Sequence, residues 1–382
     1  MRDVYVIGAG LTRFGELWSS SLRDLFTEAA TAALEDAGVD HIDGMYVGCM
    51  SSGLFVGQEH IGSLLASSLG VVPAAATRVE SACASGGMAL RAAYFEVASG
   101  ASDLVLAGGV EKTTDGADVV EVLSAMSDRE YEAYHGITQA GLYAMMARAH
   151  MSRYGTTREQ IALVAVKNQR HARSNPLAQT RSELTVEQVL ASPPVADPLR
   201  LLDCASVCDG ASAVVVGSEP YARKSGKPRI RITGVGAATD ACALHARKDV
   251  TRLEAVARAG KNAYQLAGKT PADIHVAEVH DSFSIAEIMA IEALGLAEPG
   301  RGGSATKSGA TSLGGKVPVN VSGGLRGRGH AVGATGTAQI CEILTQLRGE
   351  AGARQVHGAR VGLAQNMGGS GGSATAYILE VS

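Results

Sequence analysis

The sequence predicts an α/β protein built from two similar halves. Glycine is abundant, at 47 of 382 residues, whereas aromatic residues make up only 4% of the chain. The glycines cluster between apolar runs and have no short period, which is typical of tight turns between strands and helices. Similar series of helix, glycine and strand occur near both ends of a chain longer than one ordinary domain. We therefore predict an N-terminal half at 1–221 and a C-terminal half at 222–382.

The first elements expected are a strand and an amphipathic helix. The run "DVYVIGAG" is apolar and ends at Gly8 and Gly10. Between Leu22 and Leu34, apolar residues then recur at intervals of three and four, which gives a helix one apolar face. Gly38 is typical of a helix C-cap, and "HIDGMYVGCM" after it predicts a second strand.

The glycines of the first strand also raise the alternative of a dinucleotide site. That fingerprint requires a third glycine where Arg13 stands, and an acidic residue at the end of the second strand. Because the sequence meets neither requirement, we interpret the segment as a core strand that leaves through a glycine turn.

Two pairs of segments support the duplication. "RLEAVARAGKNAYQLAGKTPADIHVAEVHDSF" repeats the order of the first helix, its glycine stop and the second strand. "DLVLAGGVEK" follows the helix after Cys83, as "ARVGLAQNMGG" follows the helix after His330. The halves join near "GSEPYARKSGKPRI", which is rich in glycine and charge. Strand ends from duplicated halves are expected to meet at one crevice, where α/β sheets usually bind ligands.

An atypical insert lies at about 112–200. Its pattern is helical, and it is rich in methionine, histidine and arginine. We interpret Met145, Met146 and Met151 as core residues and not as part of a cofactor site.

The overall charge and the cysteine content exclude several classes of protein. A net charge of -4 and a pI near 6.2 provide no broad cationic field for nucleic acid or an anionic membrane. The chain has neither a signal-peptide pattern nor an apolar run long enough to span a membrane. Six irregularly spaced cysteines do not form a disulfide framework, and Cys204 and Cys208 lack the spacing of a zinc knuckle. We therefore expect a cytoplasmic protein without a metal site.

The stretch "RVESACASGGMALRAA" places Cys83 between an extended run and a helix. The free N–H groups and the positive dipole end of a helix favour a thiolate at such a position. Small residues from Ala82 to Gly87 let the backbone approach a thioester, and the Cys83 N–H is a candidate oxyanion donor. The structural alternative is an inert, packed cysteine.

Two histidines are expected at the same crevice. His280 ends an apolar strand in "AEVHDSFSIAE", and His330 lies in the glycine loop of "NVSGGLRGRGHAVGATG". Either histidine alone is compatible with a structural role. Together with Cys83 they predict acyl transfer in which an imidazole accepts the thiol proton. In "LAQNMGGSGGSATAYIL" the N–H near Gly368 is a further oxyanion-donor candidate, with a plain hairpin turn as the alternative.

The motifs "SACASGG", "HDSF", "GRGHAVGATG" and "QNMGGSGG", with "YHGIT" in the insert, resemble those of the thiolase superfamily. The similarity is closest to the sterol-carrier-protein type and the archaeal acetoacetyl-CoA thiolase branch, and it covers nearly the whole chain in order. It implies a duplicated, five-layered α/β/α/β/α fold in which the insert is a loop domain, and it implies a dimer. It also implies Claisen condensation, or its thiolytic reverse, on acyl-CoA. Coenzyme A would be substrate or product, with no tightly bound cofactor.

By motif position, the resemblance assigns roles to individual residues. Cys83 would be the acylated nucleophile, and His330 would activate it and help hold a thioester oxygen. His280 would lie in a second oxyanion region, while the N–H groups of Cys83 and Gly368 would form the other hole. The loop domain near His135 would cover the pantetheine of coenzyme A.

The chain departs from many thiolases where they carry a second reactive cysteine. Those positions hold Ser282 and Asn366 here, and a serine hydroxyl is a much poorer acid and base than a thiol. Ser282 is therefore expected to contact substrate or to hold a water molecule. Either His280, His330 or that water moves the α-proton, or the α-proton is not moved at all.

Two alternatives to a thiolase remain at this point. A set of one cysteine and two histidines also resembles that of ketoacyl synthases, which favours a decarboxylative or simple acyl-transfer enzyme as the second hypothesis. A scaffold or lipid-carrying subunit without turnover is the third. Relatives in this branch often work with a small OB-fold protein that carries its own zinc ribbon, and in archaea with 3-hydroxy-3-methylglutaryl-CoA synthase, so the resemblance implies such a partner.

Overall fold

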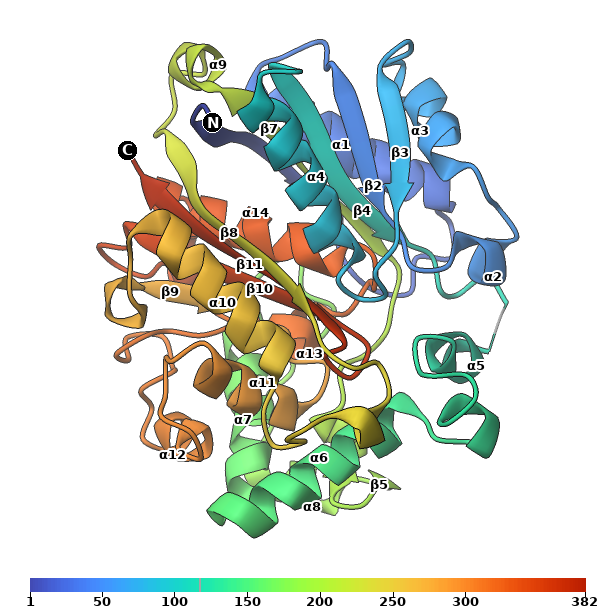
Figure 1. Cartoon of the computed structure of the whole chain (residues 1–382), viewed down its shortest axis with the longest axis vertical. Helices are drawn as coiled ribbons and strands as arrows, with labels where there is room; N and C mark the ends of the chain where they lie inside the picture. The colour runs from blue at the N-terminus through green and yellow to red at the C-terminus, as the bar shows by residue number, and fades with distance from the viewer. Residues whose placement is uncertain (117) are drawn as a thin grey trace.

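The computed structural model describes residues 1–116 and 118–382, and a sheet of nine strands runs through the upper and middle parts of the molecule (Figure 1). The N-terminal half supplies the strands β3 (Ala75–Val79), β2 (Gly44–Gly48), β4 (Leu104–Glu111), β7 (Gly210–Ser218) and β1 (Val4–Leu11), in that spatial order. The C-terminal half continues it with β8 (Ile230–Thr239), β11 (Ser373–Val381), β10 (Val361–Gly368) and β9 (Val276–Glu278). The two groups of strands are joined where β1 pairs with β8, at Tyr5↔Arg231 and Val6↔Ile230.

Helices pack on the strands in three layers, which with the two groups of strands make five. α1 (Leu22–Ala37) and α3 (Ile61–Leu69) cover the outer face of the N-terminal strands. α10 (Glu254–Ala267) and α11 (Ser284–Ala293) cover the outer face of the C-terminal strands. Between them lie α4 (Ser85–Ser99) and α14 (Thr335–Arg348), which contact each other and the strands of both halves. This arrangement confirms the duplicated, five-layered fold.

Glycines explain how closely the outer helices approach the strands. A Cβ on Gly8 or Gly10 of β1 would lie 2.3 Å or 2.0 Å from a backbone oxygen of α1. The corresponding positions of β8 have the same property, because a Cβ on Gly234 or Gly236 would lie 2.4 Å or 1.9 Å from a backbone oxygen of α10. The glycines that suggested a dinucleotide site therefore serve the packing of a helix on a strand. The segment is a core strand, as predicted, but Gly8 and Gly10 lie inside β1, so the prediction that they form the turn at its end is wrong.

The predicted insert is largely helical. It contains α5 (Val119–Ser124), α6 (Gln139–Tyr154), α7 (Arg158–Ala172) and α8 (Val186–Ala191), followed by the short hairpin of β5 (Pro194–Ala196) and β6 (Leu199–Arg200). In Figure 1 the helices α6, α7 and α8 gather at the lower end of the molecule, where α7 contacts α11, α12 (Gly302–Lys307) and α13 (Gly324–Arg328). Met146 is fully buried and Met151 partly buried in a core cluster, as predicted, but Met145 is 45% exposed, so its interpretation as a core residue is wrong.

Two further short helices complete the fold, α2 (Ser52–Val56) and α9 (Glu219–Lys224). α9 follows β7 directly and precedes β8, so it forms the connection between the two halves. Within the described part of the chain, no helix is long and apolar enough to cross a membrane.

Candidate active site

Cys83 lies in a tight turn between β3 and α4. Ala82 has a left-handed backbone with φ of 50°, which turns the chain sharply before the helix begins at Ser85. The Ser85 hydroxyl accepts a hydrogen bond from Ser81 N–H at 2.9 Å and donates to the Ala82 carbonyl at 2.6 Å, which holds the turn closed. Cys83 is only 4% exposed, at the inner end of the cavity described below.

The hydrogen bonds of His330 define its tautomer. Its Nδ1 lies 2.7 Å from the hydroxyl oxygen of Thr335, and that hydroxyl donates its one hydrogen to the Ala331 carbonyl at 2.9 Å. The Thr335 oxygen is therefore the acceptor, and Nδ1 carries the proton of the imidazole. The Nε2 atom of His330 is left with a free lone pair, which is the form that accepts a proton.

His280 has the opposite tautomer. Its Nδ1 lies 3.0 Å from the amide nitrogen of Asn366, which has hydrogens to donate and no lone pair to accept them. The proton of His280 is therefore on Nε2, a buried atom without a hydrogen-bond partner among the described residues. The backbone N–H of His280 donates to the side-chain oxygen of Gln365 at 3.0 Å, which fixes the residue at the end of β9.

The three side chains come together although they are far apart in the sequence. One ligand atom from each of Cys83, His280 and His330 lies within 4.8 Å of the other two. The two imidazole rings are 5.2 Å apart between centroids and nearly perpendicular, at 85°. The sequence prediction that these residues share one crevice agrees with this placement.

Burial controls the charge of the three groups. It raises the pKa of the Cys83 thiol to about 12, against a smaller opposing effect of the hydrogen bond from Gly369 N–H. It lowers the pKa of His330 to about 3 and that of His280 well below its usual value, and the positive charge of Arg328 adds to both effects. The resting site thus holds a neutral thiol between two neutral imidazoles. The expectation of a thiolate at Cys83 is wrong, because desolvation outweighs the dipole of α4.

A narrow cavity of about 50 Å³ leads to the Cys83 sulfur. Its walls expose mostly apolar surface. They are formed by Cys83, Leu123, Met126, Gln139, Tyr143, Ala205, Val207, Ser282, Phe283, His330 and Gly369. Ser282, predicted to contact substrate, is in this wall with a hydroxyl that has no partner among the described residues. Gly369, one residue beyond the predicted Gly368, is the glycine in the wall, and its N–H is the one that donates to the Cys83 sulfur.

His135 lies apart from these groups. It is exposed at the end of a short 3₁₀ turn, Ala133–His135, and its ring packs edge-on against Tyr134 at 5.4 Å between centroids. The structure therefore places it on the surface of the insert and not in the wall of the cavity.

Sequence reasoning missed the residues that hold the Gly369 loop. Tyr143 donates its hydroxyl hydrogen to the Gly369 carbonyl at 2.9 Å, and its ring stacks on Phe283 at 4.5 Å between centroids. From the other side, Arg247 donates to the Ser370 carbonyl at 2.7 Å and to the Ser370 hydroxyl at 2.9 Å. Gly369 has φ of 57°, so the loop has a left-handed turn at the point held by these two side chains. The motif "HDSF" contains Phe283, and "YHGIT" lies shortly before Tyr143 in the sequence. No short motif marks Arg247.

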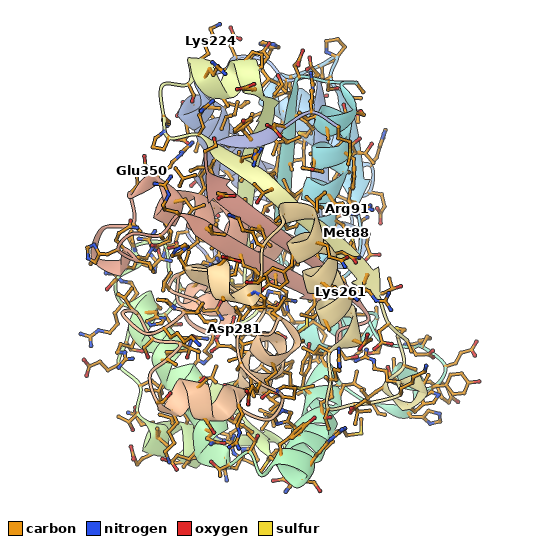
Figure 2. The ribbon with its side chains drawn as sticks, turned by 60° about the vertical axis from the view of Figure 1, so that its left-hand side comes forward. Met88, Arg91, Lys224, Lys261, Asp281 and Glu350 are labelled. Atoms are coloured by element: carbon orange, nitrogen blue, oxygen red, sulfur yellow. The ribbon has the colours of Figure 1, made fainter. Side chains whose placement is uncertain are left out.

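Asp281 holds the chain that follows His280. It is 1% exposed and lies near the middle of the molecule in Figure 2, in contrast to Lys224 at the upper edge. Its carboxylate accepts hydrogen bonds from Leu325 N–H and from the Asn168 amide, both at 2.7 Å. Burial and the nearby Glu287 carboxylate raise the pKa of Asp281 to about 6. The network connects the His280 turn to α7 and α13.

Glu111 holds the loop that contains His330, as Asp281 holds the chain after His280. This buried carboxylate at the end of β4 accepts hydrogen bonds from the N–H groups of Met50 at 2.9 Å, Ser51 at 3.1 Å and Gly333 at 2.9 Å. The segment between His330 and α14 is thereby attached to the ends of β2 and β4. Both histidines are thus supported by carboxylates that do not enter the cavity.

Comparisons with known proteins agree with the fold. The family model "Thiolase, N-terminal domain" matches residues 4–220, and "Thiolase C-terminal domain-like" matches residues 236–381. An acetyl-CoA acetyltransferase of Methanothermobacter thermautotrophicus is 53% identical over 99% of both chains. The benzoylsuccinyl-CoA thiolase subunit BbsB of Thauera aromatica is 36% identical over 93% of this chain and 91% of its own. Among solved structures, the Ltp2-ChsH2(DUF35) aldolase matches with a TM-score of 0.87 and 26% identity, over 99% of this chain and 98% of that one.

Proposed function

This chain belongs to the thiolase family and is an acyltransferase of the thiolase type, and we propose that Cys83, His330 and His280 carry out its reaction on acyl-CoA thioesters. The reaction is the thiolytic cleavage of a 3-oxoacyl-CoA by coenzyme A, or the reverse condensation of two acyl-CoA molecules. The observation that carries the proposal is the pair of opposite tautomers beside one thiol, because it provides one base and one hydrogen-bond donor where the reaction needs both.

In the first step of condensation the Cys83 sulfur attacks the thioester carbonyl of an acyl-CoA, which releases the thiolate of coenzyme A. In the first step of thiolysis it attacks the 3-oxo carbonyl of a 3-oxoacyl-CoA, which releases the carbanion of the shorter acyl-CoA. The thiol proton passes to Nε2 of His330, whose free lone pair faces the site, and a carbon–sulfur bond forms to Cys83. When the tetrahedral intermediate collapses, the leaving thiolate or carbanion takes the proton from His330. Because the resting thiol is neutral, attack and proton transfer are coupled, and no stable thiolate precedes the substrate.

The backbone supplies the donors for the oxyanion of this step. The N–H groups of Cys83 and Gly369 both lie against the Cys83 sulfur. A carbonyl carbon bonded to that sulfur would place its oxygen within reach of the same two groups. Removal of one such donor costs about 3 kcal/mol of transition-state stabilisation in other acyl-transfer sites.

The carbon–carbon step uses the two histidines in different roles. The Nε2–H of His280 has no partner among the described residues, so it is available to donate to the thioester oxygen of the second acyl-CoA, which becomes an enolate. His330, neutral again once the first coenzyme A has left, accepts the α-proton of that molecule. Neither Ser282 nor Asn366 has to act as a base in this scheme.

An acylation experiment tests the nucleophile. Incubation with acetyl-CoA followed by peptide mass spectrometry should find one acetyl group on Cys83. The Cys83→Ala variant should lose the adduct and thiolysis of acetoacetyl-CoA, whereas Cys242→Ala, which changes an exposed cysteine, should keep both. A scaffold without turnover would show no adduct on the unmodified protein.

Isotope exchange separates condensation from simple acyl transfer, the second hypothesis favoured by the residues at positions 282 and 366. In D₂O a thiolase should exchange the methyl hydrogens of acetyl-CoA, and this exchange should be lost in His330→Gln and persist in Ser282→Ala. Acylation without exchange would favour a simple acyl-transfer enzyme. Loss of exchange in Ser282→Ala alone would assign the base to a water molecule held by Ser282.

We also propose an oligomeric state, a partner subunit and a cellular compartment for this chain. β3 ends the sheet with a partly exposed face, which supports pairing with a second copy as a homodimer. The similarity to Ltp2 in its complex with ChsH2(DUF35) supports a small partner subunit of that type, and an OB-fold protein with a zinc ribbon is our candidate. A reducing, cytoplasmic setting suits six free cysteines. Light scattering on the purified chain, alone and co-expressed with a DUF35-type protein, measures both assemblies.

A further inference from the structure

Cys83 and His330 in the wall of the cavity, together with the neighbouring His280, also form the ligand set of a soft metal ion. Cys83, His280 and His330 are 4%, 0% and 3% exposed, and their ligand atoms lie within 4.8 Å of one another. A tetrahedral Zn²⁺ with bonds of about 2.3 Å to sulfur and about 2.0 Å to nitrogen separates its ligands by about 3.5 Å. Side-chain rotations that move each ligand inward by less than about 1 Å would therefore close the set around an ion.

The atoms that face the site are the correct ones for metal binding. Nδ1 of His330 donates to Thr335 and Nδ1 of His280 contacts Asn366, so the two Nε2 atoms remain for the ion. A metal-bound histidine usually donates its other N–H to a fixed acceptor, which Thr335 already provides for His330. For His280, the Asn366 side-chain oxygen is buried without a partner among the described residues, and a flip of that amide would turn it toward Nδ1–H.

The cavity leaves a fourth position open on the side of Ser282 and Gly369, where a water molecule or the sulfur of coenzyme A has room. Three protein ligands with one open position, and thiolate among them, favour Zn²⁺ over Mg²⁺ or Ca²⁺.

We propose that Cys83, His280 and His330 bind Zn²⁺, or a similar soft divalent ion, and that this binding reversibly inhibits the enzyme. The Cys83 S–H bond breaks, a sulfur–zinc bond forms and the proton leaves to solvent, while His280 moves its proton from Nε2 to Nδ1 without a change of charge. A metal-bound sulfur cannot attack a thioester, so metal ion and acyl group exclude each other. The sequence did not predict a metal site because its three ligands come from segments without zinc-ligand spacing.

The binding experiment uses Co²⁺ as a spectroscopic substitute for Zn²⁺ and does not depend on turnover. Titration of the intact, metal-free protein should give one ion per chain, the visible bands of tetrahedral Co²⁺ and a thiolate-to-cobalt charge-transfer band. Cys83→Ser should lose the charge-transfer band, and His280→Gln should weaken binding at least about a hundredfold. Asn366→Ala should weaken it about tenfold to a hundredfold, as is usual when a partner of a ligating histidine is removed.

Two controls test whether the ion binds specifically at the free thiol of Cys83. Cys242→Ser, which changes a cysteine outside the cluster, should bind Co²⁺ as the unmodified chain does. Prior acetylation of Cys83 should block binding, and Zn²⁺ inhibition of thiolysis should be reversed by a chelator. Co²⁺ binding that survives Cys83→Ser in a variant with unchanged circular dichroism would overturn the proposal. Binding without thiolase activity would leave this inference intact and count against the proposed function instead.

Discussion

At the scale of single residues, burial favours the neutral forms of both Cys83 and His330. A thiol next to an imidazole can also form a thiolate–imidazolium pair, but here burial opposes both charges, with the pKa of Cys83 raised to about 12 and that of His330 lowered to about 3. The sequence could not indicate this outcome. It placed the thiol at a helix start, where the dipole favours the anion, and it carried no information on the depth of the cavity.

The neutral pair predicts an unusual pH dependence of cysteine alkylation. Between pH 5 and pH 9, His330 is already deprotonated and Cys83 is still protonated, because this window lies above the one pKa and below the other. The rate at which iodoacetamide modifies Cys83 should therefore show no inflection near pH 6.5 and should stay below that of the exposed Cys242. Peptide mass spectrometry measures both sites in the same sample. A sigmoidal rise centred near pH 6.5 would instead indicate a thiolate–imidazolium pair.

The motifs predicted the three side chains around the thiol better than they predicted the residues farther from it. Cys83, His280 and His330 were expected in one crevice and lie together. Gly368 was the predicted donor, whereas the N–H that donates to the Cys83 sulfur is that of Gly369, and a run of glycines gives no sign of which N–H turns inward. His135 was expected near substrate from its motif alone, and its exposure on the insert surface depends on tertiary packing that the motif does not encode.

At the scale of elements, the glycines of β1 and β8 set how closely α1 and α10 pack. We predict that Gly10→Ala destabilises the protein by about 1 to 3 kcal/mol, the usual cost of overpacking, because its new Cβ would lie 2.0 Å from the Ala29 carbonyl oxygen. Gly15→Ala is the matched control, since a Cβ at Gly15 has nothing within 4 Å. Urea unfolding followed by circular dichroism compares the two variants. Equal stability of both would show that α1 can move outward at little cost.

The loop after β10 is an element whose position depends on one distant side chain. Arg247 is 8% exposed and donates two hydrogen bonds to Ser370, next to the Gly369 N–H that faces Cys83. We predict that Arg247→Ala lowers kcat by about tenfold to a hundredfold, with a smaller change in KM, because a misplaced donor weakens binding of the oxyanion more than binding of substrate.

The conservative variant distinguishes positioning from loss of fold. Arg247→Lys should recover part of kcat, since an ammonium group can donate to the Ser370 carbonyl but cannot also reach the hydroxyl in the same fork geometry. The rate of Cys83 acetylation by acetyl-CoA should fall in parallel with kcat. If both variants keep full kcat, then the loop holds its shape without Arg247.

The spacing of apolar residues predicted the helices and strands, but it did not predict that glycines in the strands allow the helices to pack closely on them. The interval of apolar residues in α1 and the glycine at its end were sufficient to predict that helix, and Gly38 indeed caps it with a left-handed φ of 67°. The duplication was visible as a repeated order of elements. The close approach of helix to strand at Gly8 and Gly234 was not visible, because it follows from contacts between segments that the sequence does not pair.

At the scale of the whole molecule, the two halves share one core layer. The middle cluster contains Val105 and Val214 from the N-terminal half together with Ile340 and Leu344 from the C-terminal half. Each half alone would expose one side of this layer to water. The predicted division at 221/222 therefore describes the repeat in the sequence, while the packing makes the halves depend on each other.

This shared layer leads to a prediction about unfolding. Hydrogen exchange at increasing urea should find that peptides from β4 and β10, in different halves, lose protection at the same denaturant concentration. Ile340→Ala, a change in the C-terminal half, should destabilise the protein by about 2 to 5 kcal/mol, as is usual for a fully buried aliphatic side chain. It should lower the midpoint of β4 as much as that of β10, because the methyl groups it removes lie between the two groups of strands. The variant Leu25→Ala, on the outer face of the N-terminal strands, serves as the comparison. If Ile340→Ala shifts only the peptides of its own half, then the halves unfold as independent units and the middle layer does not couple them.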